Sequence, residues 1–269
     1  MYNKIRNGVW MKYIKWEDIT NDKLLFGLMI ALIIAFVAVM IMSLVVFVVY
    51  VKTSWIEREN SKNMTGGELT RKILNEEGMS DVEIKPSYFY AKYWNHSKRK
   101  NTFRLRPWTI KRRSIWTMTE AAQQTVVSTW RRKKGRMGTA FTIFRIPTII
   151  SVASVILSIG TIIYMFLKFR TGEGIAVNSP EGRKTIAIVI IAFTFIATLT
   201  AWADVLKLSI IKKHVTPILM KQGFTDKEIK LFKLIYTSRL ILAIAVAIYN
   251  TLRLILQIAA SSKGEGGNK

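Results

Sequence analysis

The chain has 269 residues, with 41 lysines and arginines against 17 acidic residues, two histidines and no cysteine. The lack of cysteine excludes a disulfide framework and a thiolate metal site. Half of the residues are apolar, which is ordinary for a soluble protein, but here they are concentrated in four long blocks. These blocks argue against a soluble protein, because helices buried in a soluble core rarely have such long uncharged runs.

Each of the four apolar blocks is long enough to cross a membrane. A helix rises about 1.5 Å per residue and needs about 20 apolar residues to span the hydrocarbon core. Three blocks have no charged residue, and the last is interrupted only by Arg253, which would either meet a polar partner or extend to the headgroups. We therefore predict a multi-pass protein with transmembrane helices at 24–51, 146–169, 185–203 and 240–260, an N-terminal segment at 1–23 and a tail at 261–269.

The distribution of charge predicts an orientation. Segment 52–145 carries 21 basic and 8 acidic residues, and segment 204–239 carries eight basic residues against three acidic ones. The connection at 168–184 is short and almost balanced. Lysine and arginine near the ends of membrane helices favour the cytoplasmic side. We therefore predict a protein of the cell membrane with 52–145 and 204–239 in the cytoplasm.

Segment 52–145 is long enough to hold a small separate domain. Thr65 is a candidate N-cap with Glu68 three residues later, which is the pattern of a capping box. Apolar residues on one face follow, and Gly78 marks the end of this helix.

Two short strands and a longer helix are predicted next. The residues at 81–84 and at 102–105 alternate in polarity, which is typical of strands. From about 114 to 134 a helical pattern resumes, and it ends in a basic run that suits the helix macrodipole. The segment is therefore expected to fold as a small α+β domain.

These segments resemble the YugP-like family of membrane zinc metallopeptidases. The family's T-G-x-E segment corresponds to Thr65-Gly-Gly-Glu68, and its G-x-x-D-V-x-I segment corresponds to Gly78-Met-Ser-Asp-Val-Glu-Ile84. The helix that carries the family's H-E-x-x-H motif aligns without a gap to 114–128, and its V-E-F-D segment aligns to 201–204. The resemblance covers most of residues 24–257. It implies a mostly α-helical membrane protein with a small zincin-like cytoplasmic domain.

The zinc site that the resemblance implies is not present in this sequence. In an H-E-x-x-H helix both histidines bind zinc from one face, and the glutamate is the general base. The corresponding positions here are Gln123, Gln124 and Val127, and the position of the acidic third ligand is Trp202. Valine has no donor atom for a metal, and a glutamine side chain cannot take up a proton near neutral pH. We therefore predict a degenerate peptidase-like domain at 52–145, with no catalytic residue, metal or other cofactor.

The two histidines do not suggest a replacement site. Neither His96 nor His214 has an acidic or histidine neighbour at ligand spacing. His214 follows Asp204 by ten residues, which is roughly 15 Å along a helix. We interpret both histidines as surface or packing residues.

Basic residues interleaved with aromatic ones form the candidate binding surface of segment 52–145. Three partners are compatible with this pattern: anionic lipid headgroups, an acidic protein or another subunit of a membrane complex, and RNA such as that of a membrane-bound ribosome. No small-molecule substrate is predicted. The candidate surface residues are Arg104, Arg106, Arg112, Arg113, Arg131, Arg132, Lys133 and Lys134.

The sequence therefore predicts a pseudo-metallopeptidase that acts as a scaffold or accessory subunit of a membrane complex. The alternatives are an active membrane-bound peptidase with an unrecognised site and a membrane anchor for RNA or the ribosome. A former substrate groove is a further hypothesis. In it the edge of the strand at 102–105 would pair with an extended peptide, and Gln123 and Gln124 would hydrogen-bond at the floor.

Overall fold

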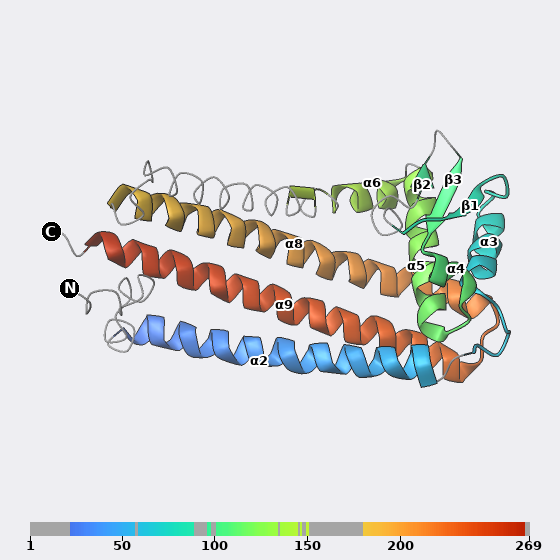
Figure 1. Ribbon diagram of the computed structural model, residues 1–269, viewed down its shortest axis with the longest axis horizontal. Helices are drawn as coiled ribbons and strands as arrows, with labels where there is room; N and C mark the ends of the chain where they lie inside the picture. Colours follow the sequence, from blue (N-terminus) through green and yellow to red (C-terminus); the bar gives the residue numbers. More distant parts are fainter. Residues whose placement is uncertain are drawn as a thin grey trace, which may run out of the picture. The chain divides into compact units, whose positions relative to one another are not determined.

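The computed structural model describes residues 22–56, 59–88, 96–97, 101–133, 135–144, 146, 149–150 and 180–266 (Figure 1). Helices dominate this part of the chain. In order, the elements are α2 (Lys23–Val51), η1 (Lys52–Ile56), α3 (Gly66–Glu76), β1 (Glu83–Pro86), β2 (His96–Ser97), β3 (Thr102–Leu105), α4 (Pro107–Lys111), α5 (Ile115–Arg132), α6 (Arg136–Ile143), α8 (Pro180–Lys221) and α9 (Asp226–Gly266).

Three described helices are long and apolar enough to cross a membrane. They lie at Lys23–Ile56, Ala187–Lys221 and Asp226–Ser261. Together they account for three of the four predicted transmembrane segments. The fourth, predicted at 146–169, falls almost wholly outside the described residues.

The basic segment predicted at 204–239 continues the helices on either side of it. α8 runs on to Lys221, and α9 begins at Asp226. The turn between them uses Gly223 at φ +73°, a conformation that glycine adopts without the steric cost of a Cβ atom. Thr225 and Glu228 form a capping box at the start of α9, because each side chain accepts a hydrogen bond from the backbone N–H of the other.

The chain divides into two compact units. Unit 1 comprises 1–40, 147–202 and 244–269, and unit 2 comprises 41–146 and 203–243. Both basic segments predicted to be cytoplasmic therefore belong mainly to unit 2.

Unit 1 contains the most apolar parts of the long helices. Trp202 of α8 donates a hydrogen bond from Nε1 to Thr251 Oγ1 of α9 at 3.1 Å. The rings of Phe36 in α2 and Tyr249 in α9 lie 6.0 Å apart between centroids. Large apolar side chains on these helices are exposed, as expected where lipid takes the place of a protein core.

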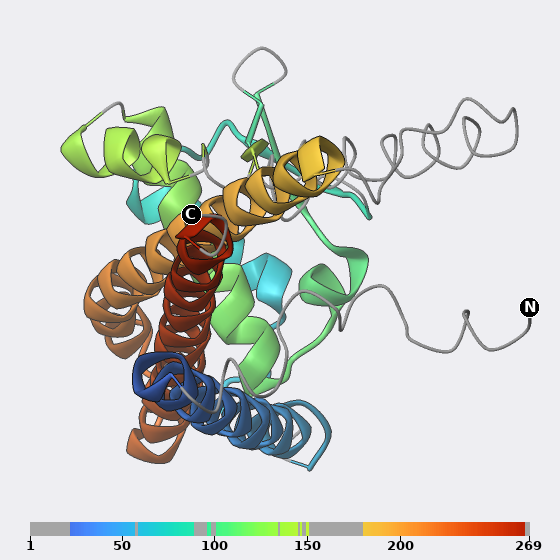
Figure 2. The same cartoon turned by 90° about the vertical axis from the view of Figure 1, so that its left-hand side faces the viewer.

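Unit 2 is an α+β domain in which α3, α4 and α5 pack together beside a three-stranded sheet (Figures 1 and 2). The larger of its two apolar clusters joins α3 and α5 to the ends of α8 and α9 that lie in the predicted cytoplasmic segment 204–239. The smaller cluster includes Leu74, Val82, Phe103 and Leu105, and it lies between α3 and the sheet. Helices and a small sheet therefore occur together in this segment.

The start of α3 explains the Thr-Gly-Gly-Glu sequence. Thr65 and Glu68 form the predicted capping box, with Glu68 N donating to Thr65 Oγ1 at 3.2 Å and Thr65 N donating to Glu68 Oε2 at 2.7 Å. The backbone carbonyl of Thr109 in α4 lies against the Cα of Gly66, where a Cβ atom would collide with it. A glycine at this position therefore allows α3 and α4 to pack closely.

Sheet topology reduces the strand edge that the predicted peptide groove would use. The strand order is β1-β3-β2, so β3 is the central strand. It pairs in parallel with β1, where Ile84 lies opposite Phe103, and antiparallel with β2, where His96 lies opposite Phe103. β3 is therefore paired along its whole length by β1 and at Thr102 and Phe103 by β2, so the described strands leave only Arg104 and Leu105 unpaired on one side.

Two element bounds differ slightly from the predictions. The first strand begins at Glu83 instead of Asp81, because a turn in which Val82 N donates to Met79 O precedes it. α5 begins after its N-cap Ser114, as predicted, and ends at Arg132.

Candidate functional site

The helix that aligns with the family's metal-binding motif is α5, in unit 2. Val127 is only 8% exposed and belongs to the larger apolar cluster. Gln123 and Gln124 precede it by one turn and are half-buried. This face of α5 therefore presents two amides and one packed aliphatic side chain.

Gln123 is bound by a cation from another helix. Arg239 of α9 donates a hydrogen bond from Nη1 to Gln123 Oε1 at 3.3 Å. The same guanidinium lies over the ring of Trp116, with its Cζ 5.7 Å from the ring centroid. The amide oxygen at the first motif position is thus turned toward a permanent positive charge.

Trp116 links this contact to neighbouring groups in unit 2. Its Nε1 donates to Glu120 Oε1 at 3.2 Å, and its ring meets Tyr50 edge-on at 5.0 Å between centroids. Tyr236, fully buried on α9, donates from its hydroxyl to the carbonyl oxygen of Thr119 at 3.2 Å. Hydrogen bonds and ring contacts therefore fasten α9 to this side of α5.

The other residues weighed for a metal site, Trp202, Asp204 and His214, each make contacts of another kind. Trp202 is in unit 1, where it bonds Thr251, and Asp204 is in unit 2, where it pairs with Lys207 at 3.2 Å. His214 Nδ1 lies 2.9 Å from the carbonyl oxygen of Ile210, and its ring meets Trp130 edge-on. Among the described residues, no three His, Cys, Asp or Glu side chains are grouped so that they could hold a metal ion.

Residues 28–201 match the family described as "Putative neutral zinc metallopeptidase". That match covers more than half of the chain. The chain belongs to this family. Comparison with curated proteins and with solved structures gave no match.

The zinc ion implied by this family does not fit the residues on α5. Gln123 faces the Arg239 guanidinium, and Val127 offers only methyl groups to its surroundings. At a separation of about 4 Å and an effective dielectric constant of about 20, a divalent ion and a guanidinium repel each other by about 8 kcal/mol. One neutral amide ligand cannot offset a penalty of this size.

The first group of predicted surface cations lies on and beside α4. Arg106 Cζ is 5.1 Å from the ring centroid of Trp108, which is itself 41% exposed. Arg113 donates from Nη1 to Asn63 Oδ1 at 3.0 Å, whereas the neighbouring Arg112 is exposed. Arg104, on the central strand, is half-buried.

The second group, at the end of α5, makes contacts inside unit 2. Arg131 donates to the Phe141 carbonyl oxygen at 3.3 Å, and Lys133 pairs with Glu77 at 2.6 Å. Arg132 donates to Asn101 Oδ1 at 2.8 Å and lies 3.6 Å from the Asp81 carboxylate. Lys134 lies outside the described residues. These three cations therefore hold α5 to α6, α3 and the strand connections.

Asp81 shows the electrostatic effect of this arrangement. A hydrogen bond from Asn101, with a smaller contribution from the Arg132 guanidinium, holds the pKa of Asp81 below its ordinary value. The carboxylate stays charged and keeps the turn before β1 tied to the end of α5.

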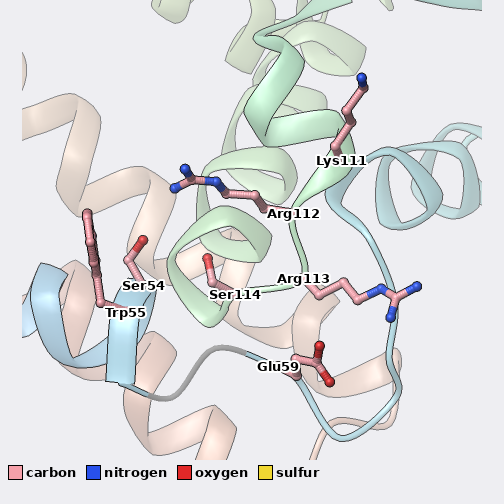
Figure 3. A pocket seen from close by; sticks show the side chains of 7 residues that line it. All are labelled: Ser54, Trp55, Glu59, Lys111, Arg112, Arg113 and Ser114. Carbon is pink, nitrogen blue, oxygen red and sulfur yellow. The ribbon is translucent and has the colours of Figure 1, made fainter.

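One feature was not anticipated from the sequence. Unit 2 has a cavity of about 500 Å³ where the end of η1 meets the segment that precedes α5 (Figure 3). The side chains that line it are Ser54, Trp55, Glu59, Lys111, Arg112, Arg113 and Ser114. The sequence signal was three consecutive cations before the N-cap Ser114, together with a tryptophan just beyond an apolar block. Only folding brings the two together.

Proposed function

We propose that this chain is a catalytically inactive member of its family and acts as a scaffold or accessory subunit of a membrane complex. The contact of Arg239 with Gln123 carries the proposal, because it puts a cation against the position where the family motif has a zinc ligand. Gln124 at the position of the general base supports it further, since an amide cannot accept a proton near neutral pH.

Tight packing around the former motif supports a structural role for unit 2. Val127 is in the apolar cluster, and Tyr236 is bonded to the backbone of α5. A peptidase needs an open cleft in which a substrate reaches the metal and the base. Here the same helix face is occupied by side chains of α9.

The exposed basic side chains of unit 2 support a binding role on the cytoplasmic side of the cell membrane. Lys111 and Arg112 are exposed at the end of α4, and Arg106 is half-buried against the ring of Trp108. Arginine and tryptophan are the residue types most enriched at energetically important positions of protein interfaces. An acidic surface of another subunit of a membrane complex is the partner that this chemistry fits.

Metal analysis of the purified, detergent-solubilised protein tests the loss of zinc. We expect less than stoichiometric zinc after dialysis against a zinc-containing buffer, and no change in Gln123→Ala. Stoichiometric zinc that is lost in Gln123→Ala would overturn the proposal.

Affinity purification from solubilised membranes tests the scaffold role. A specific subunit should be recovered with the native chain and lost from the Arg106→Glu/Arg112→Glu variant. Lys230→Glu/Lys233→Glu is the matched control, because both lysines are exposed in the same unit on α9. Recovery of no protein above background, or equal loss from both variants, would count against a specific subunit contact.

A further inference from the structure

The first membrane helix ends in a turn that changes how its last side chains are presented. α2 is uncharged from Leu24 to Val51, and η1 continues it as one π-helical turn. Thr53 is buried there and donates from Oγ1 to the Val49 carbonyl oxygen at 2.7 Å. π-Helical turns of this kind are frequent at functional sites.

This turn places an aromatic and a hydroxyl side chain at the level of lipid headgroups. Lys52 is the first charged residue after the apolar run, and Trp55 follows three residues later within the same π-helical turn. The headgroup layer extends several Å beyond the hydrocarbon core on each side, and tryptophan is enriched in it. Trp55 is 57% exposed, as a side chain in that layer would be.

Cations line the other side of the cavity. Lys111 and Arg112 are exposed, and no ion pair or hydrogen bond engages either side chain within the part of the chain that the structure describes. In Figure 3 the Arg112 side chain extends toward Ser54 and Trp55, whereas the Lys111 and Arg113 side chains extend away from these two residues. The cavity therefore has three cations and a single carboxylate around it.

The start of α5 adds to the positive potential. Ser114 is buried and caps this 18-residue helix by accepting a hydrogen bond from Thr117 N at 3.3 Å. The first backbone N–H groups of a helix have no partner within it and carry a partial positive charge. They lie beside the three cations, so both features favour an anion.

We infer that this cavity binds the phosphate group of an anionic lipid headgroup. Arg112 supplies the charge nearest to Ser54 and Trp55, and Lys111 at the rim adds to the positive potential. Ser54 supplies a hydroxyl donor, and Trp55 packs against the glycerol and the upper acyl chains. A volume of about 500 Å³ suits a headgroup. The lipid is favoured over free phosphate as the source because two of the lining residues belong to the end of a membrane helix.

This inference rests on the proposed function only in taking the chain as a membrane protein with unit 2 at the cytoplasmic surface. It depends neither on the loss of zinc nor on a partner subunit. Lipid binding is therefore measured on the purified full chain alone, so that failure of the scaffold proposal leaves the result unchanged.

The experiment is native mass spectrometry of the full chain in a neutral detergent, titrated separately with short-chain phosphatidylglycerol and phosphatidylcholine. We expect one phosphatidylglycerol to bind preferentially. In Lys111→Gln/Arg112→Gln its affinity should fall on the order of tenfold, since each cation near anionic lipid contributes to binding. The control Lys230→Gln/Lys233→Gln removes the same charge outside the cavity and should keep the native affinity.

Two further measurements identify the source of the bound phosphate group and test the cavity without changing its charge. Inorganic phosphate at millimolar concentration should not displace the lipid, and displacement without any preference for phosphatidylglycerol would assign the cavity to soluble phosphate and overturn the inference. Equal loss of affinity in both double variants would also overturn it, because the binding would then be general electrostatics. Ser54→Ala tests the site without altering its charge. If lipid affinity were unchanged both in Ser54→Ala and in Lys111→Gln/Arg112→Gln, the cavity would be excluded as the lipid-binding site.

Discussion

The guanidinium of Arg239 lies 3.3 Å from the side-chain oxygen of Gln123, although 116 residues separate them in the chain. Gln123 stands where the family motif has its first histidine, and Arg239 is in the first third of α9. The arginine thus provides an internal partner for the amide in the place of a metal. Rebuilding the family motif in this chain therefore tests directly whether Arg239 opposes zinc binding.

Rebuilding the motif should restore little zinc binding while Arg239 remains. We expect Gln123→His/Gln124→Glu/Val127→His to bind zinc weakly, because the guanidinium repels the ion. Adding Arg239→Ala should increase zinc affinity on the order of tenfold or more. Competition with a chelating zinc indicator measures this, and Lys233→Ala added to the same triple variant is the control. Equal affinity with and without Arg239 would show that the repulsion is unimportant.

Alanine at Gly66 should destabilise unit 2. Its Cβ would collide with the Thr109 carbonyl oxygen, so α3 and α4 would have to move apart. Overpacking of this kind costs about 1–3 kcal/mol, and we expect a lower midpoint in thermal unfolding of the detergent-solubilised protein. Gly135→Ala is the matched control, because no atom lies within 4 Å of the Cβ it would add. A midpoint equal to that of the native chain would show that the α3–α4 contact is not tight.

The capping box of α3 should make this helix sensitive to acid. Hydrogen bonds from the backbone and side chain of Thr65 hold the pKa of Glu68 below its ordinary value of 4.5. A lowered pKa in the folded state means that the stabilisation is complete above pH 4.5 and is lost as the pH falls through the folded-state pKa. Amide hydrogen exchange of α3 should therefore accelerate in this range.

Glu68→Gln should reduce that acid dependence, since the amide keeps a hydrogen-bond acceptor but does not titrate. Glu83→Gln serves as the control, because Glu83 is paired with Lys85 on β1 and caps no helix. An unchanged exchange profile in Glu68→Gln would assign the acid sensitivity to other groups.

Glu228 should be needed to hold the loop before α3 in place. Its carboxylate accepts hydrogen bonds from the backbone N–H and hydroxyl of Ser61, both at 2.6 Å, and from the same groups of Thr225, both at 2.8 Å. Glu228→Ala removes all four, and a hydrogen bond to a charged acceptor typically makes a net contribution of about 1.5–3 kcal/mol after exchange with water. We expect faster hydrogen exchange at residues 60–65 and at the start of α9.

Asp226→Ala is the matched control for Glu228→Ala, because Asp226 is an exposed acid in the same helical turn. Equal exchange rates in the two variants would show that the contact with Ser61 does not order the loop.

Local features of the fold could be predicted because short-range physics determines them. The capping box at Thr65 and Glu68 depends on residues three apart, and the helix predicted from about 114 to 134 is present as α5. Membrane helices require only an uninterrupted apolar run, which three described helices confirm. The absence of metal ligands at Gln123 and Val127 is likewise a property of the side chains themselves.

Long-range pairing decided the rest. From the sequence, strand 102–105 could be an edge or a centre, and the choice depends on two partners that lie on either side of it in the sheet. The sequence pattern of Arg131, Arg132 and Lys133 suggests a basic run that is free to bind a partner, but each of the three is bonded within the unit, to Phe141, Asn101 and Glu77.

The basic residues of this protein thus have several roles that composition cannot separate. The sequence by itself determined that unit 2 is strongly basic and that it follows directly on a membrane helix. Only the tertiary structure decided that Arg239 faces the former motif, that the end of α5 is bonded within the unit, and that Lys111 and Arg112 line a cavity beside Trp55. The physical reason is that a charged side chain acts on whatever folding places within a few Å, and that neighbour is usually remote in the chain.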